Sequence, residues 1–357
     1  MRDESCVTQY DIRNTRYEKM LKDITVSPAP HIAEPLSTRS VMIDVIIALV
    51  PAVAAAGYYF RMYALVLIPT CVISAVATEW LCNVIRKKPH PFESLGDFSA
   101  VVTGIILALS LPPSLPIWAA IIGSAFSIAI GKMVFGGLGA NIFNPAMVGR
   151  AFLTVSFGML MTTWTVPAPI NPAMPTIAAD NIHARTQATP LAWSKDATKA
   201  KTGSEVVNDQ LADMFTGEIS GCLGETSALA LLLGAAYLLI RRTINLHIPL
   251  AVLLSAFVFA AIANLINSDA YISPLAHLAG GGLLLCAFFI ATDPVTAPLT
   301  TKGLWIFGIG VGTITMLIRI VGEYPGGVMF SVLLMNAVTP LIDRFCKLVP
   351  AGGKPSV

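Results

Sequence analysis

The stretch that decides the fold is residues 162–224, a long polar segment whose middle reads Arg185-Thr186-Gln187-Ala188-Thr189-Pro190. Strongly apolar blocks lie on both sides of it, over residues 41–161 and 225–348. Backbone groups in hydrocarbon must satisfy one another, so apolar blocks of this length predict membrane-spanning helices. We therefore expect the polar segment to be a large loop on one side of a membrane.

The composition of the 357-residue chain indicates the same class. Hydrophobic residues make up 55% of it and charged residues 12%, against about 25% charge in a typical soluble domain. A soluble fold could not bury this much apolar surface. The net charge of +2 gives no sign of a nucleic-acid partner. We expect an all-α, polytopic integral membrane protein in contact with a lipid bilayer.

The apolar runs predict about ten transmembrane helices, five in each half, because a helix needs about 20 residues to cross hydrocarbon. Several runs are short or are interrupted by glycine and proline. The expected spans are 41–60, 63–82, 97–112, 115–133 and 145–161 before the polar segment, and 225–240, 246–266, 274–291, 303–320 and 326–345 after it.

Lysine and arginine gather in alternate loops, which orients the expected helices. The clusters 86–88 and 241–242 fall on the side of the N-terminal tail, whereas the opposite short loops hold only Arg61 and, at a helix edge, Arg319. By the positive-inside rule, we expect tails 1–40 and 349–357 to be cytoplasmic and loop 162–224 to be extracytoplasmic. The two five-helix halves, 41–161 and 225–348, would then be separate structural regions.

Five helices per half would place two similar halves upside down relative to each other. The segment 108–116 resembles 290–298, with a Pro-x-x-x-Pro pattern in both. Each is followed by an apolar span, a pair of glycines and an asparagine: Gly136-Gly137 to Asn144, and Gly326-Gly327 to Asn336. This weak repeat predicts an inverted arrangement of the kind found in membrane transporters.

Candidate polar sites inside the apolar blocks are few. The stretch 136–146 is rich in glycine and asparagine, which suits either a tight turn with an asparagine cap or the wall of a cavity. The charges in or beside the spans are Asp44, Glu79, Asp97, Arg150, Arg319 and Asp343. Charges inside a membrane often mark an ion path, but most of these stand near predicted ends, where a side chain can extend to the interface. Asp293 is expected to be a turn residue.

Catalytic and metal-binding motifs are not evident. The five histidines have no metal-ligand spacing, and the six cysteines form no Cys-x-x-Cys pair that could hold an iron–sulfur cluster. Most of the cysteines are expected to be buried as small apolar residues. We expect no catalytic residue and no metal site in this chain.

Seven stretches, in order and spacing, resemble the family of the D subunit of the Rnf electron transport complex (RnfD) and the related B subunit of the sodium-pumping NADH:quinone oxidoreductase (NqrB). The resemblance covers nearly the whole chain from Ser27 onward, and the short N-terminal tail favours the Rnf type. The stretches are 27–31, 37–45, 47–52, 137–146, 224–227, 289–295 and 336–343.

The resemblance implies a flavin-carrying redox subunit. The family attaches FMN through a phosphoester to the last threonine of a Ser/Thr-x-Ala-Thr motif, which here is Thr186-Gln187-Ala188-Thr189. A separate flavin transferase performs the attachment, since a threonine hydroxyl is a poor nucleophile unaided. The chain departs from the family pattern at His183, where an aspartate commonly stands six residues before the modified threonine.

The resemblance also implies a second, non-covalent flavin, riboflavin or a relative, with Asn141, Asn144 and Pro145 as candidate ligands. Electrons would pass between the two flavins and be coupled to Na⁺ or H⁺ transport across a bacterial or archaeal inner membrane. The implied partners in the Rnf complex are the flavin-bearing G subunit, the iron–sulfur B and C subunits, and the membrane-embedded A and E subunits. The alternatives are the quinone-reductase B subunit and a non-redox secondary transporter, which the inverted repeat would also suit.

Overall fold

The computed structural model describes residues 37–89, 91–164, 215, 220–225, 227–267, 271–322 and 326–347. The chain divides into two units, Met1–Ser37 and Thr38–Val357, and every element named below lies in the second. Within the described ranges all regular structure is helical and no strand occurs. The expected all-α fold is confirmed.

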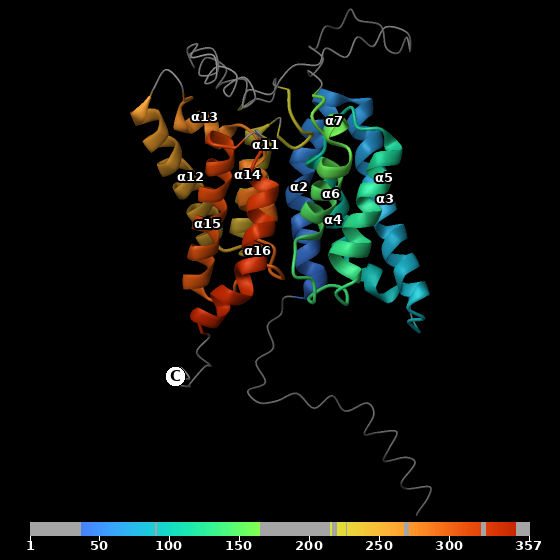
Figure 1. Ribbon diagram of the computed structural model, residues 1–357. Coiled ribbons are helices and arrows are strands. Elements are labelled where there is room, and N and C mark those ends of the chain that lie inside the picture. The colour runs from blue at the N-terminus through green and yellow to red at the C-terminus, as the bar shows by residue number, and fades with distance from the viewer. Residues whose placement is uncertain are drawn as a thin grey trace, which may run out of the picture. The chain divides into compact units, whose positions relative to one another are not determined.

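The helices fall into two sets on either side of the polar segment (Figure 1). The first half contains α2 (Thr38–Phe60), α3 (Met62–Ile85), η1 (Glu93–Asp97), α4 (Ser99–Leu109), α5 (Ile117–Ile128), the π-helix η2 (Ala129–Met133), α6 (Pro145–Ser156) and α7 (Gly158–Met161). The second half contains α11 (Ala228–Ile240), α12 (His247–Ile266), α13 (Pro274–Ala279), α14 (Leu283–Leu285), the π-helix η3 (Cys286–Ile290), α15 (Thr301–Ile320) and α16 (Val328–Phe345).

Side-chain caps start several of these helices where the sequence places a polar residue before an apolar run. Asn144, Ser227, Ser273 and Thr300 stand at the N-caps of α6, α11, α13 and α15, and each accepts a hydrogen bond from a backbone N–H in the first turn. Such caps satisfy donors that have no partner inside the helix. These caps are especially important in a membrane protein, because a backbone N–H in lipid has no water to which it could donate instead.

Each of the ten expected spans coincides with a helix or a series of short helices. Five of them, α2, α3, α12, α15 and α16, are long and apolar enough to cross a membrane. The others are shorter: α4 has 11 residues and α11 has 13, which at 1.5 Å per residue is about 16–20 Å, well below the ~30 Å of hydrocarbon. Irregular segments complete these passes, and Ser110, Leu111 and Ala297 within them are buried.

The helix bundle has two opposite ends. We call the end formed by residues 110–116, 157–164 and 220–225 the loop end, because the segment 165–219 departs from it. Its parts contact one another through hydrogen bonds from Leu223 N to the carbonyl of Leu111 (3.1 Å) and from Ser114 Oγ to the carbonyl of Thr163 (2.9 Å). We call the opposite end, with residues 134–144, 241–246 and 291–300, the Asn144 end.

The two halves run in opposite directions between these ends (Figure 1). In the first half α2, α4 and α6 start at the Asn144 end, whereas α11, the series from α13 to η3, and α16, which hold the corresponding places in the second half, start at the loop end. The contacts repeat as well: α3 packs on α4 and α5, and α5 on α6, while α12 packs on α13, η3 and α15, and α15 on α16. The inverted arrangement expected from the weak sequence repeat is therefore present.

Corresponding elements also meet across the boundary between the halves. Helix α2 packs on α11, and α6 packs on α16. With its side-chain amide oriented to satisfy its neighbours, Asn336 accepts a hydrogen bond from the backbone N–H of Asn144 (2.9 Å). When two halves are related by a two-fold axis, each helix near the axis contacts its own counterpart in the other half, as α2 and α6 do here.

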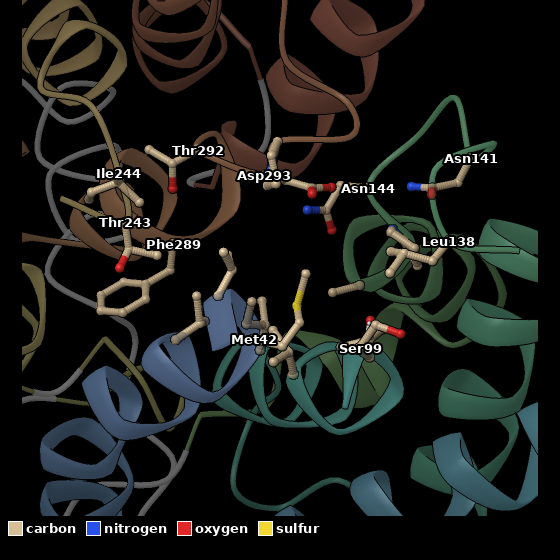
Figure 2. A pocket seen from close by; sticks show the side chains of 18 of the residues that line it. Met42, Ser99, Leu138, Asn141, Asn144, Thr243, Ile244, Phe289, Thr292 and Asp293 are labelled. Carbon is tan, nitrogen blue, oxygen red and sulfur yellow. Dashed lines mark hydrogen bonds between the residues drawn. The ribbon is translucent and has the colours of Figure 1, made fainter. Parts of the chain in front are cut away.

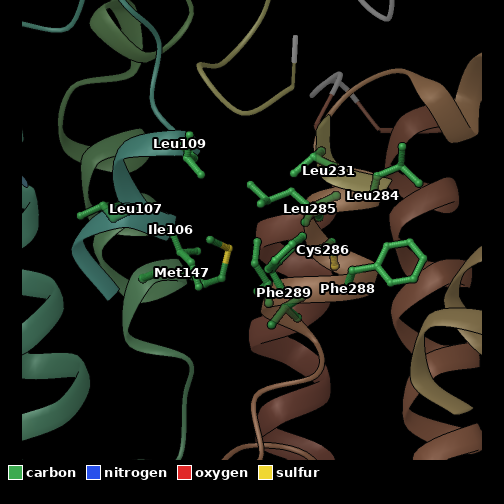
Figure 3. Packing of buried hydrophobic residues seen from close by; sticks show 14 of the residues in the cluster. Ile106, Leu107, Leu109, Met147, Leu231, Leu284, Leu285, Cys286, Phe288 and Phe289 are labelled. Atoms are coloured by element: carbon green, nitrogen blue, oxygen red, sulfur yellow. The ribbon is translucent and has the colours of Figure 1, made fainter. Parts of the chain in front are cut away.

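Apolar side chains from both halves fill the boundary away from its ends (Figure 3). Leu107, Leu109 and Met147 of the first half face Leu231 and Leu285 of the second, and all five are almost fully buried. Close approach is possible because α11 carries a glycine, Gly234, against the carbonyl of Ala48 in α2. Small residues at crossings let membrane helices pack by van der Waals contact.

Candidate functional site

A pocket opens between the two halves at the Asn144 end (Figure 2). Both halves supply its wall, so it exists only because the halves pack together. The lining residues of the first half are Val41, Met42, Val45, Ser99, Val102, Thr103, Ile106, Lys132, Leu138, Asn141, Asn144, Pro145 and Ala146. Those of the second half are Leu238, Thr243, Ile244, Phe288, Phe289, Thr292, Asp293 and Pro294.

The Gly-rich loop between η2 and α6 supplies one polar side of the pocket. Its glycines at 136, 137 and 139 all have positive φ, between 90° and 129°, a region that residues with a Cβ rarely enter. The loop brings Asn141 to the pocket, where its Nδ2 donates to the carbonyl of Phe143 (3.2 Å) while its buried Oδ1 has no partner among the described residues. A buried acceptor without a donor is costly, so this oxygen is suited to a ligand.

Asn144 combines the two roles that the sequence left open. Its Oδ1 accepts from Met147 N (3.3 Å) and caps α6, while its Nδ2 donates to the carbonyl of Ile290 in η3 (3.3 Å). The second bond crosses from one half to the other. Pro145 follows as the first residue of α6, a position that suits proline because no backbone donor is needed there.

A buried ion pair lies at the wall of the pocket. Lys132 Nζ donates to both carboxylate oxygens of Glu79 (2.8 Å each) and to Ser99 Oγ (2.6 Å), and the two charged side chains are 2% and 1% exposed. All three ammonium protons therefore have acceptors. The expectation that Glu79 extends to the membrane interface is wrong, because its partner Lys132 lies in the interior.

The same expectation is wrong for Asp44 and Arg319, which are 4% and 3% exposed. Asp44, in α2, accepts hydrogen bonds from Tyr237 Oη (3.2 Å) and Thr243 Oγ1 (3.0 Å), and it lies 3.4 Å from Arg241 Nε. These contacts join α2 to the end of α11. Because Thr243 also lines the pocket, this ion pair supports the pocket wall.

Asp293 is a turn residue, as expected, and also lines the pocket. It accepts hydrogen bonds from Val295 N (3.2 Å) and Thr296 Oγ1 (3.1 Å). Burial raises the pKa of its carboxyl above the usual value, although these two hydrogen bonds act in the opposite direction. A carboxyl that holds a proton more readily can donate as well as accept. Figure 2 shows Asp293 beside Asn144.

The unused hydrogen-bonding capacity of the pocket consists mainly of acceptors. The hydroxyls of Thr103, Thr243 and Thr292 already donate to protein oxygens, and Lys132 is fully paired. Oxygen lone pairs of these threonines and of Asn141 and Asp293 remain. Apolar and aromatic groups, including Met42 and Phe289, form the rest of the wall (Figure 2). The pocket therefore suits a flat, neutral ligand that carries hydroxyl or N–H donors.

Three of the six predicted site residues, Asn141, Asn144 and Pro145, meet in this pocket. The other three, Thr186, Ala188 and Thr189, lie outside the described residues. Sequence reasoning missed Lys132 and Thr243. A lysine inside the apolar run 117–135 was a usable signal, since such a charge needs a buried partner. Thr243 carried no comparable signal.

Metal-ligand clusters are absent from the part of the chain that the structure describes. The cysteines in that part are all free, and Cys71, Cys222 and Cys286 are buried, as expected.

Comparison with known proteins identifies close relatives over almost the whole chain. The model of the NQR2, RnfD, RnfE family matches residues 25–352. The D subunit of the Na⁺-translocating ferredoxin:NAD⁺ oxidoreductase complex of Acetobacterium woodii is 46% identical over 327 residues, covering 91% of this chain and 94% of the relative. The D subunit of the proton-translocating ferredoxin:NAD⁺ oxidoreductase complex of Clostridium ljungdahlii is 41% identical, covering 92% and 96%. The D subunit of the ion-translocating oxidoreductase complex of Stutzerimonas stutzeri is 41% identical, covering 90% and 95%.

Proposed function

This chain belongs to the NQR2, RnfD, RnfE family, and from that premise we propose that it is a flavin-carrying membrane subunit of an Rnf-type complex. Relatives that cover nearly its full length are D subunits of ion-translocating oxidoreductase complexes. It is thus a multi-pass subunit of a redox-driven translocase, and it is not catalytic alone. Its work is to hold cofactors in position between electron donors and acceptors in partner subunits.

The observation that carries the proposal is the pocket between the halves. We assign it to a non-covalent flavin, because its apolar and aromatic wall suits a flat ring and its free acceptors suit N–H and hydroxyl groups. Among the described residues that line it, Lys132 is the one cation, and Glu79 neutralises it. A phosphate group would find no free positive charge there, which favours riboflavin or a related neutral flavin over FMN.

Thr189 is the proposed site of covalent FMN. Its segment leaves and re-enters the helices at the loop end, opposite the pocket. One flavin would then lie at each end of the same helix bundle. When bound, the flavins supply one- and two-electron redox chemistry; the chain holds them apart and excludes water between them.

The proposed orientation has the Asn144 end in the cytoplasm and the loop end outside. Electron transfer between the flavins would be coupled to Na⁺ or H⁺ transport, which costs about 2.3 kcal/mol per charge against 100 mV. The proposed partners are the G, B, C, A and E subunits and the flavin transferase that modifies Thr189, in a bacterial or archaeal inner membrane.

In-gel fluorescence tests the covalent site. The full chain and Thr189→Ala are produced with a flavin transferase, separated under denaturing conditions and viewed under ultraviolet light. A fluorescent wild-type band and a dark variant are expected, with the mass of the band as a check. A dark wild type, beside a control protein that the transferase does label, would contradict the redox function and favour a transporter. A variant that stays fluorescent would move the site, with Thr186 as the next residue to change.

The pocket flavin needs a separate test. Asn141→Leu removes the unpaired acceptor, and Ile142→Ala is the matched control because Ile142 is an exposed neighbour outside the lining. Flavin released by denaturing the purified protein is measured by chromatography. We expect Asn141→Leu to weaken retention about tenfold, the effect of a hydrogen bond of ~1.4 kcal/mol, with the covalent band unchanged. Equal retention in both variants would place the flavin elsewhere.

A further inference from the structure

A series of hydrogen bonds joins the buried ion pair at the pocket wall to a carboxyl near the surface. Lys132 Nζ, which holds Glu79, donates to Ser99 Oγ (2.6 Å), and Ser99 Oγ donates to Asp97 Oδ1 (2.5 Å). The same Asp97 oxygen accepts from the backbone N–H of Ser99 (2.8 Å). The series therefore runs without a break from Glu79 through Lys132 and Ser99 to Asp97.

The two ends of this series differ in their access to water. Glu79, Lys132 and Ser99 are at most 4% exposed. Asp97 is only half-buried, and it is the last residue of η1, whose first residue, Glu93, is exposed. Asp97 can thus exchange protons with water at the Asn144 end, whereas the buried members can exchange protons only with their neighbours.

The middle of the series lies in the wall of the pocket. Ser99 and Lys132 are both lining residues, and Figure 2 shows Ser99 among the side chains that surround the pocket. Ser99 Oγ uses its proton for Asp97 and one lone pair for Lys132, so its second lone pair remains for a ligand. A polar ligand atom at Ser99 would join the series.

Glu79 keeps Lys132 ready to release and regain a proton. An ammonium group can give up a proton, and the amine that remains can accept one. While Lys132 is neutral, however, the Glu79 carboxylate is buried without a counter-charge, which is strongly unfavourable. Any proton that Lys132 loses is therefore soon replaced.

The other carboxyls near the pocket lack such a connection. Thr243 Oγ1 donates to Asp44 (3.0 Å), but Asp44 is 4% exposed and its salt-bridge partner toward the surface is Arg241, whose guanidinium is not deprotonated in proteins. Asp293 lines the pocket in the second half, and both of its oxygens accept hydrogen bonds within its own turn. Asp293 is included in the experiment below as the competing proton donor.

We propose that Asp97, Ser99 and Lys132 form a proton relay from water at the Asn144 end to the ligand in the pocket. This rests on the proposed function and adds how the charge of the pocket flavin is neutralised. Electrons that arrive from partner subunits add negative charge to the pocket, and burying that charge is costly unless protons follow.

The transfer balances at every atom. Ser99 gives its hydroxyl proton to the ligand while Lys132 Nζ gives a proton to Ser99 Oγ. Asp97, protonated by water, then gives its proton to Ser99 Oγ, and Ser99 returns a proton to Lys132 Nζ. Each residue ends in its starting state, and the net result is one proton moved from water to the ligand.

Reduction kinetics test the relay in the purified full chain, produced in a host without a flavin transferase so that only the non-covalent flavin is present. Dithionite is added by stopped flow, and the loss of oxidised-flavin absorbance is followed. Asp97→Asn keeps an oxygen that accepts from Ser99 but cannot carry the proton, so the rate should fall about a hundredfold, as for the loss of a positioned proton donor. Asp97→Glu should keep most of the rate. Glu93→Gln, at an exposed carboxyl of the same short helix, should leave it unchanged.

Acetic acid separates a relay from a structural role, because a small weak acid can deliver protons in place of the missing carboxyl. It should restore the rate of Asp97→Asn. If Asp97→Asn retains no flavin, Ser99→Ala compared with Ser99→Thr gives the same test, and only the alanine variant should be slow.

Three results would decide against the relay or the function beneath it. An Asp97→Asn rate equal to that of the wild type, or a slow rate that acetic acid does not restore, would overturn the inference and leave the proposed function standing. A slow Asp293→Asn beside a normal Asp97→Asn would overturn it too, and would assign proton delivery to Asp293. A wild type that binds no flavin would instead overturn the proposed function.

Discussion

Lys132 and Glu79 show how a single residue is constrained in this membrane interior. Neither side chain reaches water, yet the pair is complete because Ser99 accepts the third ammonium proton. Removing one partner leaves a buried charge unpaired, which typically costs about 3–5 kcal/mol, whereas replacing both by apolar residues of similar size is often close to neutral.

We therefore predict that Glu79→Leu destabilises the protein by about 3–5 kcal/mol and that adding Lys132→Met restores most of the loss. Unfolding in detergent, followed by circular dichroism against temperature, measures both. Arg241→Met is the control: its side chain is 53% exposed, and Asp44 keeps the hydrogen bonds from Tyr237 and Thr243, so a smaller loss is expected. A double variant as unstable as Glu79→Leu would show that the lysine is held by something other than charge.

At the scale of helices, the crossing of α2 and α11 joins the two halves. A Cβ on Gly234 would collide with the carbonyl oxygen of Ala48 and approach Phe289 to 3.1 Å. Phe289 lines the pocket, so a wedge at this crossing should displace the pocket wall as well as the helix.

Gly234→Val is expected to lower the unfolding temperature and to reduce the amount of non-covalent flavin. Gly57→Ala in α2 is the matched control, because no atom lies within 4 Å of the added Cβ and alanine favours a helix by up to about 1 kcal/mol. The unfolding temperature and the amount of flavin released, measured on the same preparations of both variants, test this prediction. If Gly234→Val retains flavin and stability like Gly57→Ala, the crossing is looser than its contacts indicate.

Much of the helical order was predictable, because hydropathy and helix length depend on local composition. Helices occupy all ten expected ranges, and the inverted repeat was visible in two Pro-x-x-x-Pro segments and in Asn144 and Asn336. The ion pair of Lys132 with Glu79 could not be predicted, since the two residues are 53 positions apart in the chain and only the packing of the helices brings them together. Asn141 and Asn144 could be suggested as pocket residues, whereas Thr243 required knowledge of how the halves meet.

At the scale of the whole molecule, the distribution of lysine and arginine predicts which end faces the cytoplasm. Single cysteines at Lys87 and Lys195, in a chain whose six native cysteines are replaced by serine or alanine, test this with a thiol reagent that cannot cross membranes. In intact cells we expect labelling of Lys195→Cys and not of Lys87→Cys, with both labelled after the membrane is made permeable. Labelling of Lys87→Cys alone would invert the orientation and exchange the sides proposed for the two flavins.

The two π-helical turns, η2 and η3, have a consequence for how the pocket could change during evolution. Lys132 stands on η2, and Phe288 and Phe289 stand on η3. A π turn holds one residue more than an α turn, so deleting a single residue could return it to α geometry, with the flanking turns nearly in register and the side chains of the turn itself displaced. Such a deletion would leave composition and hydropathy almost untouched. It could nevertheless turn the lysine from its carboxylate or the aromatic rings from the ligand.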